Sequence, residues 1–177
     1  MTGTIIAVVG PSGAGKDTLM RNAVARRPEI ALMRRVITRP ADADSEDFEG
    51  VTQAAFNQMR AEGRFALTWQ AHGLNYGIPY PSTISAVTLV NLSRAALDRA
   101  ADAFPGLRVI HVDAAAEIRA SRLAARGRET AEEITRRITR EAKFASGDLP
   151  VTHINNSGDL ETATTAFLAA LDEVLVP

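Results

Sequence analysis

Short apolar runs alternate along this chain with segments whose apolar residues recur every three or four positions. The run Thr4–Val9 is continuous and β-branched, which is typical of a strand buried on both faces of a parallel sheet. In 16–27 the apolar residues have helical spacing, and Pro28 ends the pattern. The same reasoning predicts strands over 32–38, 64–71, 84–90, 107–113 and 151–154, and helices over 52–63, 93–104, 114–146 (interrupted at 126–130) and 160–175.

Two segments are expected to be loops, because polar and turn-forming residues dominate them. Segment 40–50 is polar and acidic, and segment 72–81 has the sequence HGLNYGIPYP. Since strands alternate with helices, the expected fold is an α/β domain whose parallel sheet has helices on both faces. No internal repeat, low-complexity segment or linker divides the chain, so a single domain over 1–177 is expected.

Composition narrows the possible functions. The chain has 177 residues, of which 46% are hydrophobic, enough for one domain with a sizeable core. The net charge of -1 predicts binding neither to nucleic acid nor to an anionic membrane, and the absence of cysteine excludes disulfides and thiolate metal sites. No apolar run approaches the ~20 residues that span a bilayer, and the first residues do not resemble a signal peptide. A cytoplasmic protein is therefore expected, and the pattern specifies no oligomeric state.

The segment after the first strand has the residues of a phosphate-binding loop. GPSGAGKD matches the P-loop pattern G-x-x-x-x-G-K-S/T except at its last position. The glycines let consecutive backbone N–H groups point inward, and the next helix directs its positive end at the same point. Lys16 adds a cation for the β- and γ-phosphates. The alternative interpretation, a glycine turn between a strand and a helix, does not explain this lysine. The predicted nucleotide site consists of Gly10, Pro11, Ser12, Gly13, Ala14, Gly15, Lys16, Asp17 and Thr18.

Asp17 stands where a P-loop has a serine or threonine whose hydroxyl touches Mg²⁺. A carboxylate there can hold Mg²⁺ directly or through water, because hard oxygen ligands suit this ion. Alternatively, Asp17 only favours the positive N-terminus of the helix. The sequence leaves both interpretations open, while Thr18 is placed to reach the α-phosphate.

Arginines gather in two further parts of the chain. Arg34, Arg35 and Arg39 accompany an apolar run, and guanidinium groups bind phosphate bidentately, so this segment indicates an anion site. Tyr76 is either a hydrogen-bond donor to phosphate or an aromatic side chain packed in a turn. The helical segment 114–146 contains Arg119, Arg122, Arg126, Arg128, Arg136, Arg137 and Arg140. Some of them form a solvated helix face, but the break at Gly127 between two arginine-rich helices is typical of a lid that closes over phosphates.

These motifs, in this order, resemble the guanylate kinase branch of the P-loop nucleoside monophosphate kinases over nearly the whole chain. The resemblance implies a three-layer α/β fold with an arginine-rich lid at about 122–140 and an acceptor-binding insert at about 34–80. It also implies ATP as donor, Mg²⁺, and a small-molecule phosphate acceptor. Within the branch, GPSGAGKDTL, RRVITRPADADSED, WQAHGLNYGIP and NLSRAAL together look like the enzymes that phosphorylate ribose 1,5-bisphosphate to 5-phosphoribosyl 1-diphosphate (phosphoribosyl pyrophosphate) in phosphonate catabolism.

Departures from guanylate kinases favour this narrower resemblance. The serine or threonine and the glutamate with which those enzymes hold guanine correspond to Arg35 and Leu67. A buried purine edge left unpaired costs about 1–3 kcal/mol per group, so a guanine site is not expected. Arg39 and Tyr76, the remaining phosphate ligands, are kept. Where guanylate kinases have a second arginine for the phosphate, this chain has Asp42, and where they have a tyrosine in the acceptor loop it has Phe48. Asn91 stands where they have an acidic residue at a strand end near Mg²⁺.

The expected acceptor determines the expected mechanism. A phosphate oxygen is already ionised near neutral pH, so catalysis should rest on alignment and charge neutralisation. The resemblance assigns Lys16, Arg126 and Arg137 to the transferred phosphoryl group, with Arg128 beside them on the substrate, and Asn156 to the adenine, where a turn is the alternative. Arg35, Arg39 and Tyr76 are the expected acceptor ligands. A guanylate kinase and a non-catalytic guanylate-kinase-like binding module are the alternatives.

Overall fold

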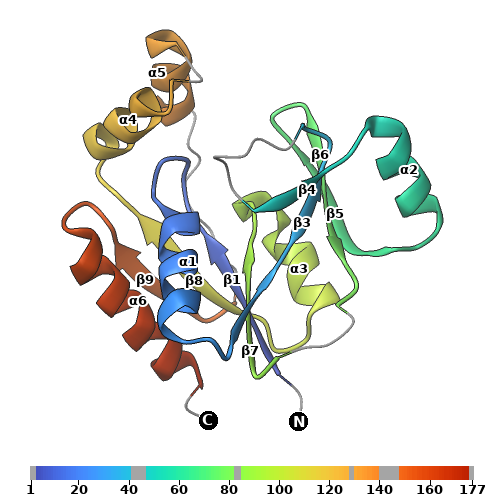
Figure 1. Cartoon of the computed structure of the whole chain (residues 1–177), viewed down its shortest axis with the longest axis horizontal. Coiled ribbons are helices and arrows are strands. Elements are labelled where there is room, and N and C mark those ends of the chain that lie inside the picture. The colour runs from blue at the N-terminus through green and yellow to red at the C-terminus, as the bar shows by residue number, and fades with distance from the viewer. Residues whose placement is uncertain (1–2, 41–46, 82–84, 128–129, 140–147, 176–177) are drawn as a thin grey trace.

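A parallel five-stranded sheet forms the centre of the structure, as Figure 1 shows. The structure is a computed structural model that describes residues 3–40, 47–81, 85–127, 130–139 and 148–175. The strands of this sheet, in spatial order, are β2 (Ile30–Met33), β7 (Val87–Asn91), β1 (Thr4–Val9), β8 (Arg108–Asp113) and β9 (Val151–Asn155). Every neighbouring pair is parallel. The expected α/β class is thereby confirmed.

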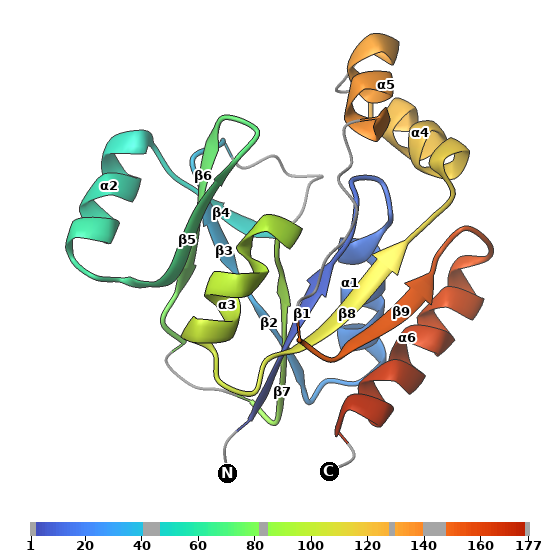
Figure 2. The ribbon, with the colours of Figure 1, turned by 180° about the vertical axis from the view of Figure 1, so that it is seen from behind.

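Helices cover both faces of this sheet. α1 (Lys16–Arg26) and α6 (Leu160–Leu175) lie on one face and α3 (Leu97–Ala103), which follows the short 3-10 helix η1 (Arg94–Ala96), lies on the other, as the view from behind in Figure 2 makes clear. The β-branched run predicts this arrangement, because successive side chains of a strand point to opposite faces.

The side chains of β1 divide between two apolar clusters. Val8 packs with Leu19 of α1 and Phe167 of α6, and all three are fully buried. Its neighbour Ala7 packs in the other cluster with Leu97 of α3. Burial on both faces fixes the register of β1 between β7 and β8, and so determines where the loop after β1 begins.

A second, smaller sheet lies beside the first. Its strand order is β4 (Phe48–Gly50), β3 (Arg35–Ile37), β6 (Leu74–Pro79) and β5 (Phe65–Ala71), and α2 (Gln53–Ala61) packs on it. β3 pairs with β4 in parallel, whereas β6 is antiparallel to both β3 and β5. Its strand β3 begins at Arg35, one of the three arginines in the segment that the sequence singled out.

Three predictions in this region were wrong. The expected strand 32–38 is two strands in different sheets, separated at Arg34. Segment 72–81, expected to be a loop, contains β6, which forms a hairpin with β5 through a tight turn whose two residues, His72 and Gly73, both have positive φ of 52° and 75°. The acidic segment expected to be a loop up to residue 50 ends in β4. β2 and β4 pair with segments that are distant in the chain, whereas β6 pairs both with the distant β3 and with its chain neighbour β5.

The arginine-rich segment 114–146 contains two helices, α4 (Ala116–Ala125) and α5 (Ala131–Thr139), as the expected interruption predicts. The break falls at the expected glycine, Gly127, which has a φ of 64°. The two helices pack against each other and stand above the end of the sheet from which the P-loop emerges (Figure 1). Among the described residues, no helix is long and apolar enough to cross a membrane.

Candidate active site

The loop between β1 and α1 winds tightly around its own backbone. Gly10 and Gly15 have φ of 147° and 89°, a region that favours glycine. A Cβ at Gly10 would lie 1.9 Å from the carbonyl oxygen of Val112, and one at Gly15 would lie 2.4 Å from Asn156 Nδ2. Glycine at these two positions therefore lets β8 and the loop after β9 press against the P-loop from below. The remaining predicted loop residues, Pro11, Ser12, Gly13, Ala14 and Thr18, follow the same turn into α1.

Lys16 is the first residue of α1, and its side chain folds back over the loop. Its Nζ donates hydrogen bonds to the carbonyl oxygens of Gly10, at 2.8 Å, and Pro11, at 3.0 Å. The ammonium group thus lies against the backbone of the loop, next to the N-terminus of α1, which is the end of a helix that favours a phosphate. The structure brings together every P-loop residue that the sequence predicted.

Asp17 and Asn91 meet at the carboxyl end of the central sheet. Asn91, the last residue of β7, is buried and donates from Nδ2 to Asp17 Oδ1 at 2.7 Å. A carboxylate has capacity for more than one such bond, so Asp17 keeps the chemistry of an oxygen ligand for a hard cation. The sequence predicted neither this bond nor that the two unusual residues of the site are direct neighbours.

Asn156 lies beneath the P-loop. It is 2% exposed, and its Nδ2 donates to the carbonyl oxygen of Ala14 at 2.8 Å, while its Oδ1 has no hydrogen-bond partner among the described residues. Arg122 of α4 joins it, donating to the Asn156 carbonyl at 2.8 Å and to those of Gly13 and Ala14 at 3.4 Å each. The observed contacts of Asn156 are with the loop itself, and its expected contact with adenine stays a prediction.

A cleft opens between α1 and the edge where the two sheets meet. Its lining combines three arginines with two carboxylates and an apolar floor: Asp17, Met20, Arg21, Leu32, Met33, Arg34, Arg35, Asp47 and Asn91. Arg35, in β3, is 7% exposed, an uncommon degree of burial for a guanidinium group. Arg34 is exposed and forms an ion pair with Asp47 at 2.8 Å. The cleft therefore adjoins the P-loop through Asp17 and reaches the predicted acceptor segment through Arg35.

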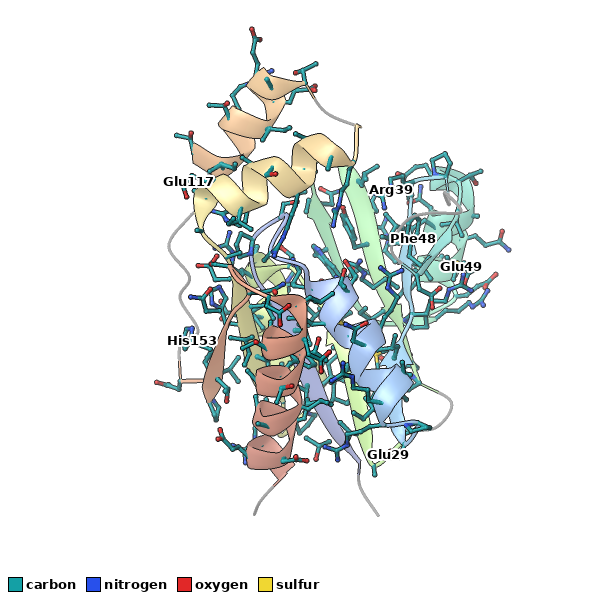
Figure 3. The ribbon with its side chains drawn as sticks, turned by 60° about the vertical axis from the view of Figure 1, so that its left-hand side comes forward. Glu29, Arg39, Phe48, Glu49, Glu117 and His153 are labelled. Atoms are coloured by element: carbon teal, nitrogen blue, oxygen red, sulfur yellow. The ribbon has the colours of Figure 1, made fainter. Side chains whose placement is uncertain are left out.

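Arg39 lies against the ring of Phe48, with its guanidinium carbon 4.6 Å from the ring centroid, as Figure 3 shows. Its Nε and Nη2 are buried, yet neither has a hydrogen-bond partner among the described residues. Buried donors are normally paired, so this guanidinium group has the features of an anion site. Tyr76, in β6, is half-buried and stacks on Trp69 with 5.2 Å between ring centroids.

The lid arginines are less completely described. Arg126 is exposed at the C-terminal end of α4. Arg137 belongs to α5, and its side chain lies outside the described part of the structure, as do Arg128 and Asp42 altogether. The placing of α4 and α5 beside the P-loop agrees with a lid, whereas the contacts of these arginines with a substrate remain predictions.

Comparison with known proteins identifies the family. The chain is 46% identical to a ribose 1,5-bisphosphate phosphokinase PhnN of Rhizobium etli, over 98% of this chain and 91% of that protein. It is 43% identical to the protein of the same name from Agrobacterium fabrum, over 96% of each chain, and 41% identical to that from Pseudomonas paraeruginosa, over 97% of this chain and 96% of that protein. The chain belongs to the ribose 1,5-bisphosphate phosphokinase family. It is therefore an enzyme of the kinase class, and the narrower resemblance is confirmed.

Solved structures place this phosphokinase family member in the expected fold. A guanylate kinase from Anaplasma phagocytophilum aligns with a TM-score of 0.68 at 17% sequence identity, over 99% of this chain and 87% of that one. At this identity the likeness shows the fold alone, which is the P-loop nucleoside monophosphate kinase architecture that the sequence predicted. No protein-family model matches the chain.

Two histidines form a pair that the sequence did not predict. His111 of β8 is opposite His153 of β9, and their rings meet edge to face with 5.2 Å between centroids. Burial lowers the pKa of His111, with the positive charges of Arg94 and Lys16 acting in the same direction and Asp113 opposing them. Within the described ranges, no three His, Cys, Asp or Glu side chains are grouped so as to hold a metal ion.

Sequence reasoning missed Arg122 and Arg21 as site residues. Both belong to helices rich in arginine, so their composition did not distinguish them from solvated neighbours. Helical position would have helped: Arg21 follows Asp17 by four residues, and residues with this spacing lie on the same helix face. Arg122 offered no comparable signal, because its three carbonyl partners come from distant segments.

Proposed function

We propose that this protein transfers the γ-phosphoryl group of ATP to the 1-phosphate of ribose 1,5-bisphosphate, forming 5-phosphoribosyl 1-diphosphate and ADP in phosphonate catabolism. The observation that carries the proposal is membership of the ribose 1,5-bisphosphate phosphokinase family at up to 46% identity over nearly the whole chain. The acceptor region supports it, because Leu67, at the position of the guanine-binding glutamate, is 5% exposed among apolar residues. Because this position holds a leucine, it offers no carboxylate to pair with the edge of a guanine.

In the proposed reaction an oxygen of the acceptor phosphate attacks the γ-phosphorus of ATP, and the bond from that phosphorus to the β-phosphate oxygen breaks. The acceptor oxygen needs no base, because a phosphate monoester carries nearly its full charge at neutral pH, its second pKa being about 6. Catalysis then requires that the two anions be aligned and their charge neutralised. The carbonyl contacts of Lys16 leave its ammonium group beside the loop that would hold the β- and γ-phosphates.

The lid provides further positive charge in this proposal. Arg126 and Arg137 would meet the transferred phosphoryl group when α4 and α5 approach the P-loop, and Arg128 would assist at the substrate. Such cationic groups stabilise the charge that develops on a transferred phosphoryl group and are worth several orders of magnitude in rate in related reactions. Asn156 is proposed to meet the adenine side of ATP while it holds the P-loop through Ala14.

Mg²⁺ is proposed to accompany ATP. The residues present fit it, because the carboxylate of Asp17 lies at the P-loop and Asn91 orients it by a 2.7 Å hydrogen bond. When bound, Mg²⁺ supplies neutralisation of the β- and γ-phosphate charge. Asp17 would hold the ion directly or through water, and Thr18 would reach the α-phosphate.

The acceptor is proposed to bind along segment 34–80. The buried Nε and Nη2 of Arg39 would receive the reacting phosphate. Tyr76 would donate to the same phosphate, and Arg35 would meet the phosphate at the other end of the sugar. We further propose that 1–177 acts as a single kinase domain with its lid at about 122–140, in the cytoplasm, with a small-molecule phosphate acceptor and neither nucleic acid nor membrane as partner.

Two other functions fit this chain less well. A guanylate kinase shares the fold, but Arg35 and Leu67 offer guanine no matching pair of groups. A non-catalytic binding module has no need of a P-loop lysine and lid arginines, and both are present in this chain. Each alternative therefore has less support than the phosphokinase.

An assay with three acceptors tests the proposal. Purified protein with ATP and Mg²⁺ is offered ribose 1,5-bisphosphate, GMP or AMP at equal concentration, and ADP release is coupled to NADH oxidation. We expect the fastest turnover with ribose 1,5-bisphosphate and a product that phosphoribosyltransferases accept. Faster turnover with GMP would replace the proposal by the guanylate kinase alternative, and no turnover with any acceptor would favour the binding module.

A further inference from the structure

Phe48 is a buried aromatic side chain at the start of β4, beside the predicted acceptor ligand Arg39. It is 2% exposed, yet it packs in none of the apolar clusters that the described part of the chain forms. A cation occupies one face of its ring instead: the guanidinium carbon of Arg39 lies over the ring, 4.6 Å from the centroid (Figure 3). Large apolar side chains are ordinarily buried against other apolar groups, so core packing does not explain this placement.

The backbone of β4 holds Phe48 in place. β4 pairs in parallel with β3, and Phe48 is opposite Arg35 in that pairing. Arg34 contacts the same strand and the residue before it: its Nη2 donates to the Phe48 carbonyl oxygen at 3.2 Å, and its Nε lies 2.8 Å from Oδ1 of Asp47. The ring is therefore attached to a backbone that both strand pairing and a side chain hold.

The backbone that leads to Arg39 is held independently of Phe48. Thr38, the residue before it, exchanges two hydrogen bonds with Asn75: its N–H donates to the Asn75 carbonyl oxygen at 3.1 Å, and its Oγ1 accepts from the Asn75 N–H at 2.9 Å. These bonds fix where the Arg39 side chain begins. An arginine side chain keeps several rotatable bonds beyond its Cα, so the guanidinium group needs a further contact to hold its orientation.

Stacking on a ring restrains a guanidinium group without using its N–H groups. The ring contacts the face of the plane, whereas the N–H donors point outward within the plane. Nε and Nη2 together form one edge of that plane, with two parallel N–H groups that match two oxygens of a phosphate. In Arg39 these are the buried nitrogens that have no hydrogen-bond partner among the described residues. The contact with Phe48 therefore orients Arg39 and leaves a complete bidentate edge unpaired.

We propose that Phe48 is a positioning residue for the acceptor: its ring holds the guanidinium group of Arg39 in the orientation in which Nε and Nη2 receive a phosphate. The inference rests on the proposed function, in which Arg39 binds the reacting phosphate. Because the side chain is already oriented, less conformational entropy is lost when the phosphate binds. The ring also excludes water from one face of the guanidinium group, and a hydrogen bond to an anion is stronger in such surroundings than in open water. Phe48 thus contributes to acceptor affinity through Arg39.

Phe48→Leu removes the ring and keeps an apolar side chain at the position. The dissociation constant of ribose 1,5-bisphosphate is measured by isothermal titration calorimetry with the full chain, Mg²⁺ and a non-hydrolysable ATP analogue. We expect the acceptor to bind about 3- to 10-fold more weakly, which is the effect of losing a cation–π contact. The dissociation constant of the ATP analogue, measured without acceptor, should change less than about twofold. Phe48→Tyr keeps the ring and should recover part of the acceptor affinity.

A double-mutant cycle decides whether Phe48 acts through Arg39, because residues that act on one another have non-additive effects. In an Arg39→Met background, Phe48→Leu should change the dissociation constant of the acceptor by less than about twofold, since the ring then has no guanidinium group to orient. Phe56→Leu is the matched control: Phe56 is 1% exposed in α2 and packs with Val36 of β3, but its ring stacks on Phe65. It perturbs the packing of the same small sheet and should leave acceptor binding unchanged. Thermal unfolding of each variant checks that the fold is intact.

The outcomes separate the inference from the function on which it rests. Weaker acceptor binding in Phe48→Leu, absent in the Arg39→Met background and in Phe56→Leu, supports the inference. Additive effects of the two substitutions, an equal effect of Phe56→Leu, or unchanged acceptor binding in Phe48→Leu or Arg39→Met overturns it, even if ribose 1,5-bisphosphate is the acceptor. If the unaltered protein binds GMP and not ribose 1,5-bisphosphate, the proposed function fails. The same cycle with GMP, which also carries a phosphate monoester, then decides the inference, and binding of neither ligand overturns both.

Discussion

The P-loop and its supporting residues, the donor half of the site, differ from segment 34–80, the acceptor half, in how their polar side chains are hydrogen-bonded. Around the P-loop, three side-chain donors are bonded to backbone carbonyls: Lys16 to two of the loop, Asn156 to that of Ala14, and Arg122 to three. In the acceptor half, the buried Nε and Nη2 of Arg39 have no hydrogen-bond partner among the described residues. One half is ordered before a substrate arrives, and the other leaves donors for the substrate to satisfy.

This contrast separates what is general in the site from what is specific. A triphosphate is held mainly by backbone N–H groups and a helix terminus, so the donor half depends on backbone shape and on the residues that support it. The acceptor is distinguished by side chains at the edge of the second sheet. Substitutions in the donor half should therefore affect every acceptor equally, whereas those in the acceptor half should change one acceptor relative to another.

The largest effect is expected from Lys16→Met in the donor half. Loss of this cation should lower kcat/KM by about 10³-fold or more, because it removes charge stabilisation from the transferred phosphoryl group. The reduction should be equal for every acceptor that is turned over, and thermal unfolding should show an intact fold. Turnover close to that of the unaltered protein at saturating ATP and Mg²⁺ would contradict the assignment of the P-loop.

Arg39→Met tests the acceptor half. We expect kcat/KM for ribose 1,5-bisphosphate to fall about 10- to 100-fold, with the dissociation constant of ATP unchanged. Since two unpaired buried donors are removed, the free energy of unfolding should rise by about 1 kcal/mol. Arg108→Met is the control and should change neither quantity, because Arg108 is exposed at the start of β8, outside segment 34–80 and the lining of the cleft. A parallel loss of ATP affinity would contradict the division between the halves.

Asn156→Ala tests the support beneath the P-loop. Removal of the 2.8 Å bond to Ala14 should raise the dissociation constant of ATP about tenfold and lower stability by about 1–2 kcal/mol. The neighbouring Asn155→Ala should leave ATP binding unchanged, because Asn155 is exposed and its Oδ1 accepts from Ser157 instead. Equal effects of the two variants would show that the loop after β9 acts as a whole and not through Asn156.

Asp17→Ala tests the boundary between the halves. If Asp17 helps to hold Mg²⁺, the Mg²⁺ concentration for half-maximal rate should increase several-fold, and Asp17→Ser should restore part of the difference. Asn91→Ala should act in the same direction but more weakly, because it only releases the carboxylate from its 2.7 Å bond. Unchanged Mg²⁺ titrations would mean that Asp17 only interacts favourably with the positive N-terminus of α1, an interaction that contributes about 0.3–1 kcal/mol of stability.

The smallest effect should come from His111, which lies outside both halves. Its pKa is lowered in the folded protein, chiefly by burial, so the unfolded chain binds a proton more readily between this lowered pKa and the usual value of about 6.5. The contribution of His111 to the free energy of unfolding should therefore be fully present above about pH 6.5 and should be lost as the pH falls from there through the lowered pKa. His111→Gln should flatten the dependence measured by urea unfolding. A steeper decrease in the His111 variant would contradict the stated cause.

The sequence by itself determined the central sheet, its covering helices and the P-loop. β1, α1 and the loop between them lie within a single stretch of the chain, so the glycines at 10 and 15, Lys16 and the apolar spacing of the helix carried the necessary information. The break at Gly127 was equally local. In these places intrinsic backbone preference and apolar pattern agree with the final fold.

Only the tertiary structure decided the second sheet and the neighbours of the site residues. Whether 72–81 is a loop or the strand β6 depends on its pairing with β3 and β5, and Arg34 divides one apolar run between two sheets because the sheets diverge there. The contacts of Asp17 with Asn91, of Asn156 with Ala14 and of Arg39 with Phe48 join residues 9 to 142 positions apart. No local pattern specifies such contacts, because they depend on how separate elements pack, and packing is a property of the whole chain.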